Sequence, residues 1–370
     1  MRGGYIMIKR FSVRNFKNFH NEVVLDFSNK RDYEFNTNLL KNGLINKMLM
    51  YGPNNSGKSN FGAAMMDITT HLTDNRRDNP LYAYYINGDY IDEEIFFSYE
   101  FLFDNQIVTY RYSKDSKRKL LNEELQFNEE VIFKYNYKTG KFSNDISEAK
   151  HINLTQRNTE VSALKFIFNN TLYWPDHSPV KQLFAFVQNM LWFRSLRSNE
   201  FMGQDPNAGD LHEFIIKNEL LNEFENFLRA LGQSYSLCTI SESDRTVIGV
   251  KYKNATARFD FVASTGTLSL WLFFFWMNRK EPISFVFLDE FDAFYHYEVA
   301  TNILRYINKR IDFQSVLTTH TTLLLDNELV RPDCCVILDK GKIRSLADST
   351  KKTIRIGHNL EKMMLGGEFE

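Results

Sequence analysis

The sequence has little cysteine and no long hydrophobic run, and these two shortages exclude several classes of protein. Only three of its 370 residues are cysteine, at positions 238, 334 and 335. They form no Cys-x-x-Cys pair, so the sequence indicates neither a disulfide framework nor a zinc site, which is usual in the reducing cytosol. The longest apolar run, residues 268–277 (LSLWLFFFWM), is too short to cross a bilayer and predicts a buried helix instead.

The sequence also lacks a signal-peptide core and an excess of either charge. The first residues, MRGGYIMIKRF, contain no apolar h-region, so we expect a cytoplasmic protein without a membrane partner. There are 45 basic and 46 acidic residues, for a formal net charge of −1. The whole chain is therefore no general polyanion binder. One basic cluster, Lys114, Lys117, Arg118 and Lys119, falls between two predicted strands, and we interpret it as a solvated hairpin tip.

The most informative motif that is present is GPNNSGKS at residues 52–59, which matches the phosphate loop G-x-x-x-x-G-K-[ST]. An apolar run at 45–51 predicts a buried strand before it, and residues 60–68 show helical spacing after it. A strand, a glycine loop and a helix place backbone N–H groups where they hold phosphate. We expect the following residues to line a bound nucleotide, with Lys58 on the β- and γ-phosphates and Ser59 on Mg²⁺: Gly52, Asn54, Asn55, Ser56, Gly57, Lys58, Ser59 and Asn60.

Two later segments are typical of the other half of such a site. Residues 285–290 (FVFLDE) predict a buried strand that ends in two carboxylates. We expect Asp289 to hold the metal and Glu290 to orient or deprotonate the attacking water. Residues 315–320 (SVLTTH) predict another buried strand, which ends in His320. A histidine at a strand end is often only structural, but here its order along the chain favours a switch that contacts the γ-phosphate.

The segment ASTGT at 263–267 has two interpretations. It can simply cap the helix predicted at 267–277. Alternatively, Ser264 and the amide of Gly266 can form a second anion site, which would grip the γ-phosphate of a nucleotide held by another subunit.

Apolar runs alternate with helical patterns in both end regions of the sequence, which predicts an α/β fold with a parallel sheet. Residues 7–19 and 22–27 predict two antiparallel strands, and 94–103, 107–112 and 131–137 predict paired strands. From 161 to 232 the pattern is helical, with residues 183, 184, 187 and 191 at helix spacing. Strands are expected again at 235–240, 246–252 and 257–262. We expect a first ATPase segment at 1–79, an inserted β and helical subdomain at 80–232 and a second ATPase segment at 233–370. The turn-rich stretch 74–80 would mark the first boundary.

Taken in order, these motifs resemble an ABC-type ATPase head of the branch that includes SMC proteins, RecF-like proteins and the OLD-like ATPases of phage defence. The resemblance covers residues 14–19 (RNFKNF), the phosphate loop, ASTGT, 285–296 (FVFLDEFDAFYH) and LTTH, and it leaves the middle third unmatched. The final segment 355–370 (RIGHNLEKMMLGGEFE) is similar to the tail of stand-alone ATPases in phage-defence modules, of the PARIS- or RloB-associated type. Its simpler interpretation is an amphipathic helix packed on the head.

The resemblance implies a P-loop NTPase fold, with ATP and Mg²⁺ as cofactors, and a homodimer or larger ring in which two heads enclose two ATP molecules. Lys58, Ser59, Asp289 and Glu290 match the site within one head. Ser264 and Gly266 match the signature that acts on the partner's nucleotide, Asp292 matches the D-loop and His320 the switch. Asn18, on the first hairpin, is the expected adenine contact.

The sequence departs from the family pattern at several points. The transporter signature LSGGQ is replaced by STGT, which disfavours a transporter subunit. The Q-loop glutamine has three candidates, Gln156, Gln182 and Gln188, and Tyr295 stands where relatives often carry leucine. OLD-like nucleases continue into a Toprim domain with its own acidic cluster. No such cluster follows here, so we expect any effector to be a separate protein.

The sequence is compatible with three functions. The first is an ATP-hydrolysing sensor in an anti-phage defence or toxin–antitoxin-like module that controls a separate effector, expected to be a nuclease. The second is a RecF- or SMC-like DNA-repair ATPase that clamps DNA. The third is a scaffold that is assembled by ATP and turns over slowly. DNA or a phage component is the alternative partner.

Overall fold

The computed structural model describes residues 6–73, 84–154, 158–194, 201–202 and 210–369. Its central sheet holds five parallel strands in the order β11-β16-β17-β5-β18, with β12 and β19 antiparallel at the two edges. The bounds of these strands are β5 (Lys47–Tyr51), β11 (Met190–Arg194), β12 (Phe201–Met202), β16 (Phe285–Asp289), β17 (Gln314–Thr319), β18 (Cys335–Asp339) and β19 (Lys342–Ser345). The inner strands are almost entirely buried, which explains why they are continuous apolar runs.

A second, antiparallel sheet has the order β10-β9-β8-β7-β6-β1-β2. Its strands are β1 (Ile6–Arg14), β2 (Val23–Asp26), β6 (Ile95–Phe103), β7 (Gln106–Lys114), β8 (Leu120–Phe127), β9 (Glu130–Asn136) and β10 (Lys141–Asn144). Along β6 every second side chain is buried, because one face of this sheet packs on the core. A short pair, β3 (Leu40–Lys41) and β4 (Leu44–Ile45), leads into β5.

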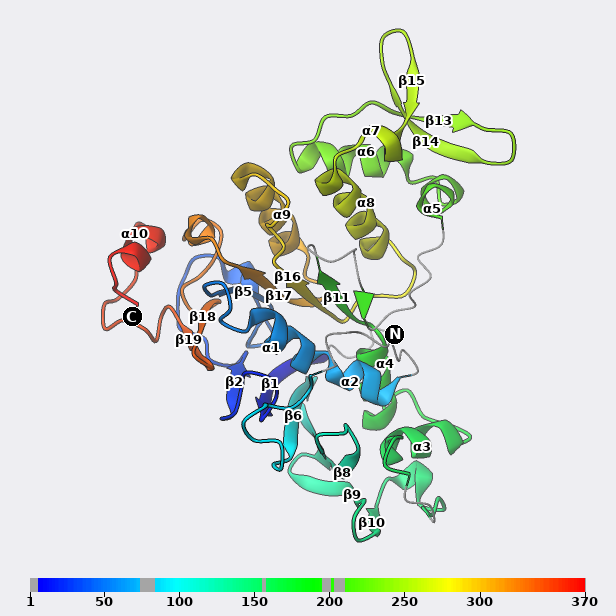
Figure 1. The fold of residues 1–370 in the computed structure, drawn as a ribbon, viewed down its shortest axis with the longest axis vertical. Coiled ribbons are helices and arrows are strands. Elements are labelled where there is room, and N and C mark those ends of the chain that lie inside the picture. Colours follow the sequence, from blue (N-terminus) through cyan, green and yellow to red (C-terminus); the bar gives the residue numbers. More distant parts are fainter. Residues whose placement is uncertain (1–5, 74–83, 155–157, 195–200, 203–209, 370) are drawn as a thin grey trace.

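Helices α1 (Lys58–Met65), α2 (Asp67–Leu72) and α4 (Pro179–Gln188) belong to the core between the two sheets (Figure 1). The Phe61 ring of α1 meets the Phe11 ring of β1 at 5.3 Å. A Cβ atom on Gly62 would lie 2.6 Å from the ring of Phe287 in β16, so α1 lies directly against the central sheet. Helix α3 (Ala163–Asn170) contributes to the same core.

The opposite face of the central sheet carries a second core. Its helices are α5 (Leu211–Lys217), α6 (Leu221–Ala230), α8 (Thr265–Met277) and α9 (Tyr297–Lys309). Beyond them, at the top of Figure 1, lies a small sheet of β13 (Leu237–Ser241), β14 (Thr246–Lys251) and β15 (Thr256–Arg258), followed by α7 (Phe259–Val262). The tail ends in α10 (Leu360–Leu365), which contacts the 3-10 turn Thr322–Leu324. Within the described ranges, no helix combines the length and apolarity needed to cross a membrane.

The sequence predicted most strands correctly, but three expectations were wrong. Residue 191 lies in β11, not in a helix, and the predicted strand 257–262 is divided into β15 and α7. Lys114 is not at a solvated tip: it is buried, and its Nζ lies 2.7 Å from the Asp67 carboxylate. The predicted boundary at 74–80 lies outside the described residues. The division at 79 and 232 stays a proposal, and β11 joins the middle segment to the central sheet.

Candidate functional site

The phosphate loop joins the end of β5 to the start of α1. Gly57 has φ +101°, and a Cβ atom there would lie 2.6 Å from Asn18 Nδ2 and 2.8 Å from the Phe19 ring. Only glycine fits both the conformation and the space, because other residues rarely adopt this φ. The loop is thus held tightly against the β1–β2 connection.

Lys58 is buried at the first position of α1. Its Nζ donates hydrogen bonds to the carbonyl oxygens of Gly52 (2.6 Å) and Pro53 (3.0 Å). Burial lowers the pKa of Lys58, and the nearby carboxylates of Glu290, Asp289 and Asp292 partly oppose this. The ammonium group is therefore held by the backbone of the loop, and the charges of the three acids act on it.

The two carboxylates at the end of β16 are organised by one residue of the neighbouring strand. The Thr318 hydroxyl donates a hydrogen bond to Asp289 Oδ1 (3.0 Å) and accepts one from the Glu290 backbone N–H (2.7 Å). Glu290 has φ +48°, a left-handed conformation that is uncommon outside glycine and often marks functional sites. The chain therefore turns sharply after Asp289, and Thr318 fixes that turn.

Asp292 and His320 differ in how firmly they are held. The Thr319 hydroxyl donates a hydrogen bond to Asp292 Oδ2 (2.6 Å), and Asp292 is buried. His320 follows directly and is exposed. Its contact with a γ-phosphate stays a prediction.

Ser264 begins α8, as the helix-cap interpretation requires. Its Oγ accepts a hydrogen bond from the Thr267 N–H (3.2 Å). A Cβ atom on Gly266 would lie 3.1 Å from the Phe294 carbonyl oxygen, so the start of α8 packs on the loop that contains Asp292. Ser264 itself is exposed, and α8 lies on the face of the sheet opposite α1 (Figure 1). This arrangement leaves the second anion site open as a proposal.

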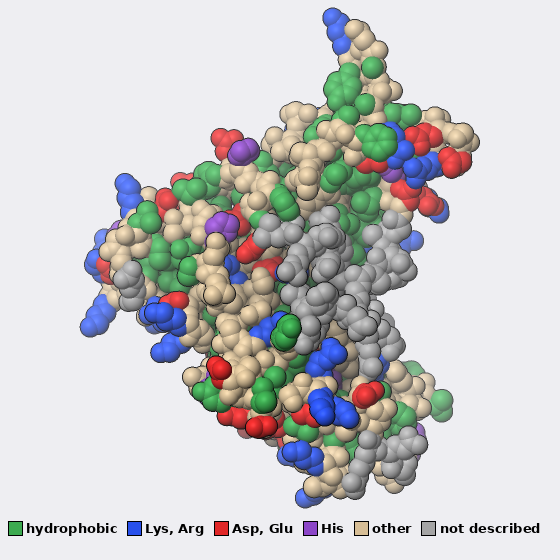
Figure 2. All heavy atoms as spheres, in the orientation of Figure 1, with side chains coloured by type: hydrophobic (Ala, Val, Ile, Leu, Met, Phe, Trp, Pro, Cys, Tyr) green, Lys and Arg blue, Asp and Glu red, His purple; other side chains and the backbone are tan. Residues whose placement is uncertain are grey.

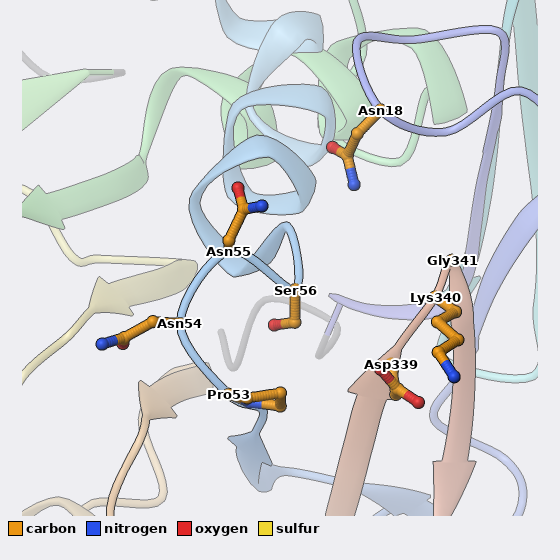
Figure 3. A pocket seen from close by; sticks show the side chains of 8 residues that line it. All are labelled: Asn18, Pro53, Asn54, Asn55, Ser56, Asp339, Lys340 and Gly341. Atoms are coloured by element: carbon orange, nitrogen blue, oxygen red, sulfur yellow. The ribbon is translucent and has the colours of Figure 1, made fainter.

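A pocket of about 330 Å³ lies beside the phosphate loop (Figure 3). The β18–β19 turn faces the loop across it, and the pocket is lined by Asn18, Pro53, Asn54, Asn55, Ser56, Asp339, Lys340 and Gly341. The Asn18 Oδ1 accepts a hydrogen bond from Asn60 Nδ2 (2.6 Å), which orients its amide. Asn18, the expected adenine contact, lines this pocket, and Asp339 and Lys340 are lining residues that no motif predicted.

Residues 47–326 match the family model described as "AAA domain, putative AbiEii toxin, Type IV TA system". The chain belongs to this family. It is therefore an ATPase of the AAA type in the general sense, and the matched range contains the phosphate loop, Asp289, Glu290 and His320. Together with the architecture, the match confirms the predicted mixed α/β P-loop NTPase fold.

Three solved structures are similar over nearly the whole chain. A SMC head bound to the C-terminal winged-helix domain of ScpA is 12% identical, covers 92% of this chain and 97% of its own, and has a TM-score of 0.49. The SMC head domain from Thermotoga maritima is 14% identical, with coverages of 91% and 98% and a TM-score of 0.44. The recombination mediator RecF with ATP is 14% identical, with coverages of 93% and 100% and a TM-score of 0.40. No curated protein matches the sequence.

The residues present fit a magnesium ion that is shared with a nucleotide. In the described part of the chain, no group of three or more histidine, cysteine, aspartate or glutamate residues could hold a metal by itself. Mg²⁺ usually takes one or two protein oxygens and completes its shell with phosphates and water. The Asp289 carboxylate and the Ser59 hydroxyl are such a donor pair, at the end of β16 and in the first turn of α1.

The structure also bears on the remaining candidates. Gln182 and Gln188 lie in α4, and Gln156 lies outside the described residues. One of the two strands that pair with β16 is β11, and it ends in Arg194, whose Nε lies 3.5 Å from Asp289 Oδ2. In the tail, Leu360 of α10 is buried against the head, which agrees with the packed amphipathic helix.

Proposed function

We propose that the protein binds and hydrolyses ATP as an ABC-type ATPase, and that two copies close around two nucleotides. One observation carries this proposal. Lys58 begins α1, which packs against β16, the strand that leads to Asp289 and Glu290, whereas the exposed Ser264 begins a helix on the opposite face of the sheet. A second copy could supply Ser264 and Gly266 to this nucleotide.

Each residue of the candidate site has a defined task in this proposal. The loop amides and Lys58 bind the phosphates. When bound, Mg²⁺ would supply charge neutralisation at the phosphates, held by Ser59 and Asp289. Glu290 orients the attacking water and accepts its proton, and its position is fixed by the Thr318 hydroxyl. Asp292 and His320 connect this chemistry to the dimer surface.

The biological role that we propose is a sensor or switch in an anti-phage defence or toxin–antitoxin-like module. The family description refers to a type IV toxin–antitoxin system, which supports this choice. Figure 2 shows basic and acidic side chains interspersed on the visible surface, in keeping with the net charge of −1. We therefore expect a separate effector, in the cytoplasm, to be the controlled partner, with a nuclease as the first candidate.

The deciding experiment replaces Glu290 by glutamine and measures mass in solution with and without ATP. Glu290→Gln should retain ATP, lose turnover by two or more orders of magnitude and form a stable dimer, because a general base is typically worth 10²–10⁴-fold. Glu223→Gln, an exposed residue of α6, is the matched control and should behave as wild type. Undiminished turnover in Glu290→Gln would exclude this assignment of the base.

Three further measurements separate the alternatives. Tight, steeply salt-dependent binding to duplex DNA would favour the DNA-repair clamp. Wild-type turnover too slow to detect, together with ATP-dependent dimerisation, would favour the assembly scaffold. Recovery of a nuclease with the wild-type protein but not with Glu290→Gln would support the switch. Recovery of a nuclease only with the trapped dimer of Glu290→Gln would also support it.

A further inference from the structure

Tyr295 joins two parts of the chain that the proposed function assigns to two different nucleotides. It follows the acidic segment at the end of β16, and its side chain packs on Gly266, in the first turn of α8. A Cβ atom on Gly266 would lie 3.3 Å from Cε1 of the Tyr295 ring. The Tyr295 hydroxyl also donates a long hydrogen bond of 3.4 Å to the Gly266 carbonyl oxygen. The contact therefore involves both the ring and the hydroxyl group.

The loop that carries Tyr295 is held by hydrogen bonds of its own. The backbone N–H of Tyr295 donates a hydrogen bond to the Asp292 carbonyl oxygen, and that of Ala293 donates one to the Glu290 carbonyl oxygen, each at 3.1 Å. The Asp292 carboxylate is in turn held by the Thr319 hydroxyl. The position of Tyr295 is therefore set by the same loop that presents Asp292.

The contact with Gly266 differs from the family pattern. Burial raises the pKa of Tyr295 to about 12, so the hydroxyl keeps its proton at neutral pH and donates to the carbonyl oxygen. Leucine, which relatives often carry at this position, has neither an aromatic ring nor a hydrogen-bond donor. The link between this loop and α8 is therefore a property of this chain.

The first turn of α8 moves as one unit with Ser264. The Ser264 side chain accepts a hydrogen bond from the Thr267 N–H, which joins it to the helix. Because Gly266 has no side chain, the Tyr295 ring and the Phe294 carbonyl oxygen reach the backbone of this turn itself. A shift of Tyr295 would therefore change the direction in which the start of α8 faces.

We infer that Tyr295 is a positioning residue, which holds the first turn of α8 so that Ser264 and Gly266 act on the nucleotide of a second copy of the chain. This inference rests on the proposed function. It has a specific consequence for the dimer. Loss of Tyr295 should impair the site of the other chain, whereas the site of the same chain, with its own Lys58 and Glu290, should keep its activity.

The test compares two mixed dimers that contain the same two substitutions. In the first, one chain carries both Glu290→Gln and Tyr295→Ala, and the other chain is wild type. In the second, one chain carries Glu290→Gln and the other carries Tyr295→Ala. Each dimer then has one intact Glu290, and a different affinity tag on each chain allows it to be isolated. The turnover number and KM for ATP are measured for both.

We expect the first dimer to lose turnover by about tenfold, because its active site receives Ser264 from the chain that lacks the Tyr295 ring. The second dimer should stay within about twofold of the dimer that carries Glu290→Gln alone. Its altered chain keeps the backbone hydrogen bond to Asp292, which needs no side chain at position 295. The affinity of isolated Tyr295→Ala for ATPγS, measured by calorimetry, should equal that of wild type.

Two further variants serve as rescue and control. Tyr295→Phe keeps the ring and removes only the long hydrogen bond, so the first dimer made with it should recover to within about threefold. Tyr252→Ala is the matched control, because Tyr252 is an exposed tyrosine just after β14, and it should give equal turnover in both arrangements. A melting temperature for each variant confirms that it is folded.

The outcomes are distinct. Equal turnover in the two mixed dimers, or a loss in the second alone, would overturn the role of Tyr295, while dimerisation and turnover of the wild-type protein leave the proposed function intact. If Tyr295→Ala does not fold, Tyr295→Leu replaces it: a loss in the first dimer alone supports the inference, and equal turnover overturns it. If the wild-type protein binds ATP but forms no dimer, the proposed function itself fails.

Discussion

The Thr319 hydroxyl donates a hydrogen bond of 2.6 Å to the carboxylate of Asp292, which ties the strand before His320 to the loop after Glu290. Its neighbour Thr318 ties the same strand to Asp289 and Glu290. Two adjacent threonines therefore couple β17 to the acidic segment. A shift of His320 on contact with a γ-phosphate would be transmitted to both ends of that segment.

Thr319→Val tests this coupling. The variant should lose about 1.5–3 kcal/mol in free energy of unfolding, because the buried carboxyl group of Asp292 loses its hydrogen-bond donor. It should bind ATPγS normally but dimerise less on ATP addition. Thr301→Val is the control, since the Thr301 hydroxyl in α9 is buried with no hydrogen-bond partner among the described residues. Chemical denaturation and mass in solution measure both effects; equal behaviour of the two variants would contradict the coupling.

The lowered pKa of Lys58 predicts that nucleotide binding depends on pH. Burial lowers its pKa below the usual lysine value of 10.5, so the free protein loses this proton at a lower pH than an exposed lysine does. The triphosphate binds the protonated form, and its affinity should therefore fall as pH rises through the lowered pKa. Lys58→Ala should nearly abolish binding and remove this dependence. Titrations with ATPγS between neutral and alkaline pH test it, and a wild-type affinity in Lys58→Ala would refute the site.

The same shift has the opposite consequence for stability. Between the lowered pKa and 10.5 the unfolded chain binds more protons at Lys58 than the folded chain does. The contribution of Lys58 to the free energy of unfolding therefore rises with pH across this window. A comparison of wild type with Lys58→Ala by denaturation isolates that contribution.

Gly57 should tolerate no side chain. Gly57→Ala combines an unfavourable φ with close contacts to Asn18 and Phe19, so we expect a loss of roughly 1–3 kcal/mol in stability together with weaker nucleotide binding. Gly43→Ala is the control, because Gly43 has φ +77° but nothing within 4 Å of the added carbon. Gly43→Ala therefore also has an unfavourable φ, like Gly57→Ala, but makes no close contact. The difference between the two variants, measured by denaturation, isolates the packing of the loop on the first hairpin.

Lys114 should contribute to stability, not to ligand binding. Its ammonium group pairs with the fully buried Asp67, which also accepts a hydrogen bond from Tyr112 at 2.7 Å. Lys114→Met should therefore destabilise the protein by about 3–5 kcal/mol, because it leaves a buried carboxylate uncompensated. Lys117→Met, at the exposed turn of the same hairpin, should change stability by less than about 0.5 kcal/mol. Equal melting temperatures for the two variants would contradict this difference.

The sequence predicted the parts of the site that lie within one local motif. Residues 52–59 and 285–290 carry their strand, loop and helix context with them, and both were correctly assigned to elements. The sequence did not predict β11 correctly, because a short apolar segment such as MLWFR fits a buried helix as well as a strand. β8 was missed because its LLNEELQF is too polar to alternate clearly.

The position of Arg194 beside Asp289, and that of the β18–β19 turn beside the phosphate loop, could not be predicted from the sequence for a different reason. Arg194 meets Asp289 because β11 pairs with β16, 95 residues later in the register, and Lys340 lines the same pocket as the phosphate loop across a still larger sequence separation. Neither pairing has a local signature. The hydroxyls of Thr318 and Thr319 were visible in the sequence beside His320, but only the neighbouring strand shows what they bind.

The position of β5 has a consequence for how the protein is made. Its two hydrogen-bonded neighbours in the sheet are β17 and β18, which begin at residues 314 and 335. During synthesis, β5, which leads into the phosphate loop, leaves the ribosome early. It cannot pair with β17 and β18 until most of the chain has been made. Such long-range parallel pairing is slow to form. A nascent or truncated chain that carries GPNNSGKS but ends before β17 would thus carry the motif without the site.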